Sequence, residues 1–207
     1  MTEQYQEWLP HLDQITDDMF SWEAPSQPPG ICATCKVQDA KYRCIECWDS
    51  APRCAKCHSE AHRNLWFHWL EFWNGQYFER HDMISIHFVI YLGHDGQQCP
   101  NLAPNQKSTK LTIAHTNGIH RCKVQWCYCS DAPDQASQLI RARIWPATWK
   151  NIRTAFTVPL LRLYDHLWCI SKVSEWDFMQ LLQRLSDNAF PDDVTVCSLS
   201  SAHISYS

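Results

Sequence analysis

The chain has 207 residues, which is enough for one large domain or two small ones. Hydrophobic residues make up 45% and charged residues 19%, which excludes a wholly disordered chain, because such chains are poor in apolar residues and rich in charge. The formal net charge of −4 excludes a globally basic nucleic-acid-binding protein, so a contact with DNA would need a local basic patch.

The N-terminal segment shows no sign of export or membrane anchoring. It reads MTEQYQEWLPHLDQITDD, without the basic start and apolar stretch of a signal peptide. No run of apolar residues is long enough to span a membrane. We therefore expect a nuclear or cytoplasmic protein that is not secreted and has no membrane partner. The chain has 12 Cys, and in a reducing compartment paired cysteines are expected to bind metal rather than to form disulfides.

Residues 1–30 are interpreted as an acidic N-terminal segment and a linker. Residues 1–23 carry six carboxylates and no Lys or Arg, and the stretch APSQPPGI at 24–31 has the composition of a linker. Apolar residues recur there at helical spacing, at Trp8, Leu9, Leu12, Ile15 and Met19. This pattern predicts a short amphipathic helix that Pro10 interrupts, and we expect it to pack on its own domain rather than on a partner.

Three C-x-x-C pairs and three histidines crowd residues 32–68, and two of the histidines, His62 and His68, follow the last pair at ligand spacing. A C-x-x-C pair places two thiolates on one tight turn, where both can bind the same tetrahedral ion. The eight candidate ligands are enough for two closed four-coordinate zinc sites, whereas the alternative is a core of unmetallated thiols. These ligands are Cys32, Cys35, Cys44, Cys47, Cys54, Cys57, His62 and His68. His58 competes for a place because it directly follows the last of these cysteines.

The order of these ligands resembles a cross-braced B-box zinc finger, which we place at residues 31–75. The resemblance implies one zinc ion held by Cys32, Cys35, Cys54 and Cys57. It implies a second zinc ion held by Cys44, Cys47, His62 and His68. Because so short a segment buries little apolar surface, we expect chelation to unfold residues 32–68.

The next elements are expected in chain order as follows. A Trp-rich join occupies 69–78, the β-prone run ISIHFVIYL predicts a strand over 84–92, and a loop runs from about 93 to 109. Two further β-prone runs flank Asn117-Gly118, which predicts a hairpin of 111–116 with 119–127. 

A second, looser cluster of cysteines and histidines lies around this hairpin. We expect Cys99, Cys127 and Cys129 to hold a zinc ion with His94 as the fourth ligand, because His94 shares a loop with Cys99. In an ideal hairpin His120 lies opposite His115 and faces away from Cys127, which argues against His120 as a ligand. The alternative is a cross-strand pair of histidines beside free thiols.

Two helices are expected near the C-terminal end. One covers about 154–168, with Pro159 at its start or disturbing it. The other contains Phe178, Leu181, Leu182 and Leu185 at helical spacing, begins at a cap by Ser174 and ends by Asn188 and Pro191.

Six motifs in order extend over much of the chain: FWNGQYF, YLGHDGQQCP, HTNGIHRCKVQWCYC, SQLIRARIWPAT, TAFTVPLLRLYDHL and WDFMQLLQRLSDN. Together they resemble the CxC-type cysteine cluster associated with KDZ transposases, a fungal family of DNA transposons. The resemblance covers roughly residues 25–190, and we assign its cysteine cluster domain with helices to 76–190. Residues 191–207 are interpreted as a divergent tail.

The resemblance implies a zinc-binding N-terminal region of a transposase, whose catalytic core in full-length members lies further downstream. We expect this chain to stop before that core and to have no enzymatic activity. Two zinc ions are expected as cofactors, and a third if the second cluster is metallated.

One stretch of the chain has the composition of a DNA-contacting strip. Residues 135–164 contain no Asp or Glu, and Trp145 and Trp149 lie among their five basic residues. Arg pairs with phosphates and indoles stack on bases, so Arg141, Arg143, Lys150 and Arg153 are the candidate contacts. The alternative is an ordinary solvated face, to which Arg162 would also belong.

The sequence thus predicts an α+β protein: a small B-box-like zinc finger, then a short antiparallel sheet with a cysteine cluster, then C-terminal helices. Its expected function is that of a non-catalytic zinc-binding region, derived from a KDZ-type transposase, that contacts DNA or transposase subunits. One alternative is a B-box-like protein-interaction scaffold whose partner surface is Trp66–Trp73. Another is an enzyme with catalytic zinc in the second cluster, if only three protein ligands bind there.

Overall fold

The computed structural model describes residues 3–23 and 29–194 and confirms the α+β class. The chain divides into two compact units. The first comprises the described residues up to Ala61 together with His68–His81, and the second comprises His62–Phe67 and the described residues from Asp82 onward. No helix in the described ranges is both long and apolar enough to cross a membrane.

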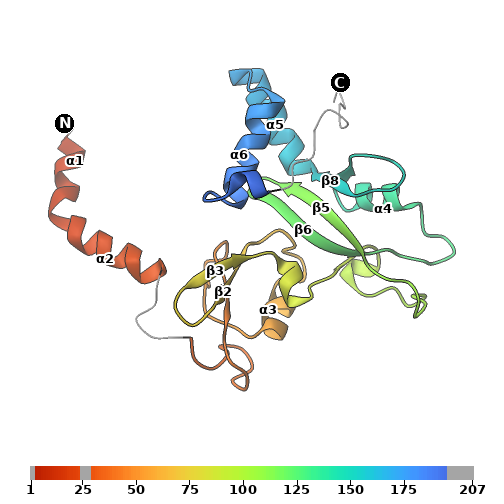
Figure 1. Ribbon diagram of the computed structural model, residues 1–207, viewed down its shortest axis with the longest axis horizontal. Helices are drawn as coiled ribbons and strands as arrows, with labels where there is room; N and C mark the ends of the chain where they lie inside the picture. Colours follow the sequence, from red (N-terminus) through yellow and green to blue (C-terminus); the bar gives the residue numbers. More distant parts are fainter. Residues whose placement is uncertain (1–2, 24–28, 195–207) are drawn as a thin grey trace. The chain divides into compact units, whose positions relative to one another are not determined.

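The N-terminal segment is helical and interrupted at Pro10, as expected. Helix α1 (Glu3–Trp8) leads into the 3₁₀ turn η1 (Leu9–His11), which is followed by α2 (Leu12–Glu23) (Figure 1). The side chains of residues 6–21 are exposed apart from half-buried Ile15. The expectation that this apolar stripe packs on its own domain is therefore wrong for these residues.

The first unit contains a three-stranded antiparallel sheet in the order β1-β2-β3. Its elements are β1 (Tyr42–Cys44), β2 (Leu70–Trp73), β3 (Phe78–His81) and the short helix α3 (Ala55–Ala61). The segment interpreted as a Trp-rich join is thus a β-hairpin. Its turn is fixed by Asn74, whose Oδ1 accepts the backbone N–H groups of Gln76 at 2.9 Å and Tyr77 at 3.0 Å.

The second unit is built on a five-stranded sheet in the order β4-β6-β5-β8-β7. The strands are β4 (Ile90–Tyr91), β5 (Thr109–His115), β6 (Gly118–Gln125), β7 (Ile144–Pro146) and β8 (Thr154–Thr157). The pairs β4–β6 and β5–β8 are parallel, so the sheet is mixed rather than antiparallel as expected. A parallel pair needs a long crossover, and the chain between β5 and β8 is long enough to provide one.

The expected hairpin is present with a different register. The loop is Thr116-Asn117, so His115 pairs with Gly118 and His120 pairs with Ile113. In this register the side chain of Asn117 makes two contacts: its Nδ2 donates to the carbonyl of Phe67 at 2.8 Å, and its Oδ1 lies 2.9 Å from His120 Nε2. The alternative interpretation, a cross-strand pair of His115 and His120, is therefore wrong.

The strand expected over 84–92 is largely wrong. The 3₁₀ turn η2 (Met83–Ile86) occupies its first half, and His87 follows with a φ of 60°, which breaks an extended strand. Only the two residues of β4 pair in the sheet. The apolar run reflects burial, since Met83, Ile86 and Ile90 are all buried, and a short apolar run does not by itself distinguish a strand from other buried backbone.

Three helices complete this unit: α4 (Gln135–Arg141), α5 (Val158–Ser171) and α6 (Glu175–Ser186). Pro159 lies in the first turn of α5, where its missing N–H has no intrahelical partner to lose. Ser174 caps α6 as expected, accepting the backbone N–H of Asp177 at 3.1 Å. Short 3₁₀ turns, η3 (His94–Gly96) and η4 (Pro191–Asp193), lie before β5 and after α6.

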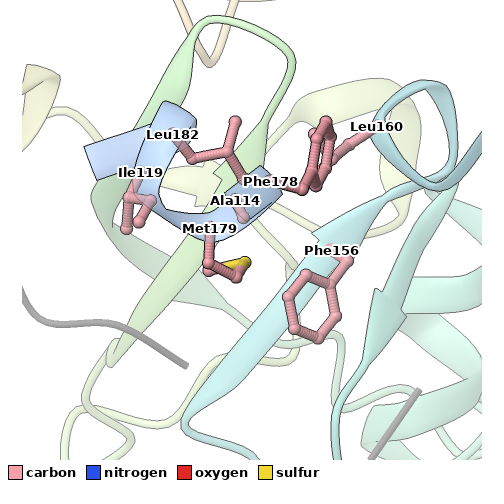
Figure 2. Close-up of a cluster of buried hydrophobic side chains, with 7 residues drawn as sticks. All are labelled: Ala114, Ile119, Phe156, Leu160, Phe178, Met179 and Leu182. Atoms are coloured by element: carbon pink, nitrogen blue, oxygen red, sulfur yellow. The ribbon is translucent and has the colours of Figure 1, made fainter. Parts of the chain in front are cut away.

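Helices α5 and α6 pack side by side over one end of the sheet (Figure 1). Figure 2 shows the core they form, in which Phe178, Met179 and Leu182 from α6 contact residues of β5, β6, β8 and α5. This core and the buried strand residues hold the second unit together by apolar burial. In the first unit Cys32, Cys54 and Cys57 form a hydrophobic cluster of their own, and Ala40, Trp69 and Leu70 are buried as well.

Candidate metal centres

The structure brings the candidate ligands together in three groups of four, and in each group the ligand atoms lie within 4.8 Å of one another. The first group is Cys32, Cys35, Cys54 and Cys57; the second is Cys44, Cys47, His62 and His68; the third is His94, Cys99, Cys127 and Cys129. His58 is buried within α3 and His120 within β6, and neither belongs to a group. The described cysteines form no disulfides.

The first group is built from two C-x-x-C turns. Cys54 and Cys57 lie at the start of α3, and Cys32 and Cys35 lie on a turn that Lys36 completes with a φ of 58°. Three of the four thiols are buried. Burial alone would raise the pKa of Cys32, but hydrogen bonds from the backbone N–H groups of Cys35, Cys54 and Thr34 lower it to about 6. Backbone donors thus prepare this sulfur to be a thiolate ligand.

The second group combines sulfur and nitrogen donors. Cys44 ends β1, Cys47 follows it, and His68 precedes β2, while His62 follows α3 directly in the chain. The Nδ1 of His68 lies 3.4 Å from the Sγ atoms of both Cys44 and Cys47. Burial raises the pKa of Cys44 to about 12, and burial also lowers the pKa of His68. A low imidazole pKa keeps the nitrogen lone pair available for a metal.

The third group has the edge lengths of a tetrahedral site. Cys99 Sγ lies 3.9 Å from Cys127 Sγ and 3.8 Å from Cys129 Sγ, and His94 Nε2 lies 3.2 Å and 3.4 Å from the last two sulfurs. Metal–sulfur bonds of about 2.3 Å at tetrahedral angles give sulfur–sulfur edges of about 3.8 Å. The donor set and the spacing therefore fit a zinc ion.

Two thiols of the third group, Cys99 and Cys129, have pKa values shifted in opposite directions. The backbone N–H of Tyr128, which lies 3.4 Å from Cys99 Sγ, lowers the pKa of Cys99 to about 6 against the effect of burial. The neighbouring thiol of Cys127, followed by burial and the Cys99 thiol, raises the pKa of Cys129 to about 11. Thiolates this close repel one another, and a divalent cation removes that repulsion.

The loop and the strand end that carry the third group are fixed by two residues that the sequence analysis did not identify. Gln138 of α4 accepts the N–H of Cys127 at 2.8 Å and donates to its carbonyl at 3.1 Å. Gly93 has a φ of 85°, and a Cβ there would lie 3.4 Å from the Cβ of Cys127. Nothing in the sequence pattern distinguishes Gln138 from other glutamines, because its role depends on a contact between α4 and the end of β6.

The candidate DNA-contacting residues are exposed. Arg141 lies in the last turn of α4, Arg143 directly before β7, Lys150 in the β7–β8 loop and Arg153 directly before β8. Since β7 and β8 are antiparallel, Arg143 and Arg153 lie at opposite ends of this strand pair. The Trp149 side chain is 60% exposed, whereas Trp145 is half-buried.

The comparisons with known proteins agree with this geometry. A family model described as "CxC2 like cysteine cluster associated with KDZ transposases" matches residues 83–190, just over half of the chain. The matched segment contains the whole third group. Neither a search of curated proteins nor one of solved structures found a match. The chain belongs to the family of CxC2-like cysteine cluster proteins associated with KDZ transposases.

Proposed function

We propose that the chain is a non-catalytic, zinc-binding accessory region of a KDZ-type transposase, or a remnant of one, which contacts DNA or transposase subunits. The observation that carries this proposal is the third group, because it lies inside the matched segment and its donors have the spacing of a tetrahedral site. We assign the acidic segment and linker to 1–30, the B-box-like finger to 31–75, the cysteine cluster domain to 76–190 and the divergent tail to 191–207.

A non-catalytic role is favoured by the number of ligands. Each of the three groups offers four ligand atoms, so a zinc ion bound by all four has no open position for water or substrate. A catalytic zinc site normally keeps one such position. The ions would therefore stabilise the fold.

Native mass spectrometry of the purified protein tests the zinc assignment. We expect three zinc ions per chain, and two in Cys129→Ser, which removes one ligand of the third group. Cys169→Ser is the matched control, because Cys169 is exposed and lies outside all three groups, and it should keep three ions. Two ions in both the wild type and Cys129→Ser would show that the third group binds no zinc.

DNA contact is the finer part of the proposal. It is supported by the exposure of Arg143, Lys150 and Arg153 and by the absence of acidic residues from 135–164. If these side chains contact phosphates, Arg143→Gln with Lys150→Gln should weaken binding to unrelated duplexes alike. The same change should reduce the salt dependence of the affinity by about one counterion per lost contact.

A matched control for the DNA experiment is Lys56→Gln with Arg63→Gln. Lys56 and Arg63 are also exposed, and their substitution removes the same amount of positive charge outside the strip. Equal affinities for the two double variants would contradict a DNA contact by this strip.

The rival B-box scaffold has less support, because none of the side chains from Trp66 to Trp73, its expected partner surface, is exposed.

A further inference from the structure

The second unit has an open groove of about 960 Å³, open solvent included, along the wall of the third group. One side of the groove is formed by three of the four ligands: His94, Cys127 and Cys129. The lining also contains a half-buried indole, Trp66, and a half-buried phenol, Tyr91. The family match assigns no function to this groove, which shares only Arg141 with the candidate DNA-contacting residues.

The charges in the lining favour a cationic ligand. Asp95 and Asp131 are exposed carboxylates, and no ion pair among the described residues involves either of them. Arg141 is the one cation of the described lining apart from histidine, so the carboxylates exceed it by one. A zinc ion held by three thiolates and a neutral imidazole adds a further formal charge of −1.

The aromatic residues supply a second attraction for cations. Ammonium and guanidinium groups bind over the faces of Trp and Tyr rings, and partial burial holds Trp66 and Tyr91 in place at the groove. The indole N–H of Trp66 donates to the carbonyl of Arg63 at 2.7 Å, which fixes the ring further. Gln138 adds no recognition group, because its amide is bonded to the backbone of Cys127 and Pro133.

We propose that this groove binds a lysine-rich peptide segment of a protein partner. An open groove accommodates an extended chain, the carboxylates pair with its ammonium groups, and the rings contact the aliphatic stems and the cations. A nucleic acid would instead bring phosphates against Asp95, Asp131 and the thiolate centre. The proposal rests on the proposed function in one respect, because a zinc ion bound by the third group would lie in the groove wall.

Fluorescence anisotropy with the full-length, zinc-loaded protein tests the proposal. The probes are a labelled short lysine-rich peptide, the same peptide with acetylated lysines and a labelled single-stranded oligonucleotide. We expect the unmodified peptide to bind and the acetylated peptide to bind much more weakly. Asp95→Asn with Asp131→Asn should weaken peptide binding by roughly tenfold, since two exposed charge pairs are lost.

The matched control is Asp192→Asn with Asp193→Asn, which makes the same change in net charge at exposed residues outside the groove. Arg141→Gln separates this inference from the DNA contact, because it should strengthen peptide binding and weaken DNA binding. Equal peptide affinities for the two Asp double variants would overturn the proposal. It would also be overturned if the oligonucleotide bound more tightly than the peptide and Arg141→Gln abolished that binding. Zinc counted in the same samples shows separately whether the third group is metallated.

Discussion

At the scale of single residues, the thiols of the third group are tuned by a backbone N–H group and by one another. The backbone N–H of Tyr128 lowers the pKa of Cys99, and the neighbouring Cys127 thiol raises the pKa of Cys129. The spacing of Cys99, Cys127 and Cys129 in the sequence shows that they can meet, but it does not show which sulfur is ionised. That property depends on backbone direction, which only the folded loop defines.

Zinc binding at the third group should depend on pH in two ranges. In the metal-free protein Cys129, with a pKa of about 11, is protonated up to strongly alkaline pH, so zinc displaces its proton at neutral pH. Cys99, with a pKa of about 6, carries a proton only at lower pH. Zinc affinity should therefore fall as pH falls, and the slope of its logarithm against pH should steepen by about one proton below pH ~6. Competition with a chelator across pH 5 to 8 measures this slope, and a constant slope would contradict the assignment.

Gln138 should tune the third group without binding the metal. Gln138→Ala removes the two hydrogen bonds to the backbone of Cys127, so the ligand is no longer held in place. We expect zinc affinity at this group to fall roughly 10- to 100-fold, as is usual when an outer partner of a ligand is lost. Titration with a zinc-selective indicator measures the zinc affinity of the weakest site, which in Gln138→Ala should be the third group. Gln14→Ala on the exposed face of α2 is the control and should leave all sites unchanged.

At the scale of elements, prediction from the sequence succeeded where local signals and burial agree. Helix α6 combines a capping serine with an apolar stripe of helical period, and both signals were visible. The run over 84–92 is rich in β-branched and aromatic residues, but such apolar residues are also typical of buried non-strand backbone. The hairpin β2–β3 was overlooked although Asn74-Gly75, a favoured turn pair, lies between its strands. The register of β5 with β6 differs from that of the expected hairpin, and the hydrogen bond from Asn117 to the carbonyl of Phe67 is a distant contact that the local sequence pattern does not reveal.

The packing of α6 on the sheet should account for much of the stability of the second unit. Phe178 is 1% exposed and lies within the core shown in Figure 2, whereas Trp176 on the same helix is 69% exposed. Phe178→Ala should reduce the free energy of unfolding by about 3–5 kcal/mol, because it leaves a cavity in a close-packed core. Trp176→Ala is the matched control and should cost well under half of that. Urea denaturation monitored by circular dichroism compares the two variants.

At the scale of the whole molecule, the two units differ in what stabilises them. The second unit has a sheet with α5 and α6 packed on it and a core of aliphatic and aromatic side chains. In the first unit one hydrophobic cluster consists of metal-ligand candidates, with Cys35 packed against Cys32, Cys54 and Cys57. Without metal, this cluster is a set of buried thiols, and the other buried apolar side chains described in this unit are those of Ala40, Cys44, Trp69 and Leu70. Zinc would then supply most of the free energy of folding, on the order of 10 kcal/mol per site.

Metal removal should therefore unfold the first unit and spare most of the second. After treatment with a zinc chelator, amide hydrogens of residues 32–61 and 68–81 should exchange rapidly, whereas those of β5, β6 and α6 should stay protected. The segments that carry the third group, residues 93–99 and 127–133, should lose protection with the metal. Hydrogen exchange followed by mass spectrometry resolves these regions in one experiment, and a calcium-selective chelator is the control. Unchanged protection of residues 32–61 after complete zinc loss would show that this unit is stable without metal, and would contradict the structural role proposed for the metal.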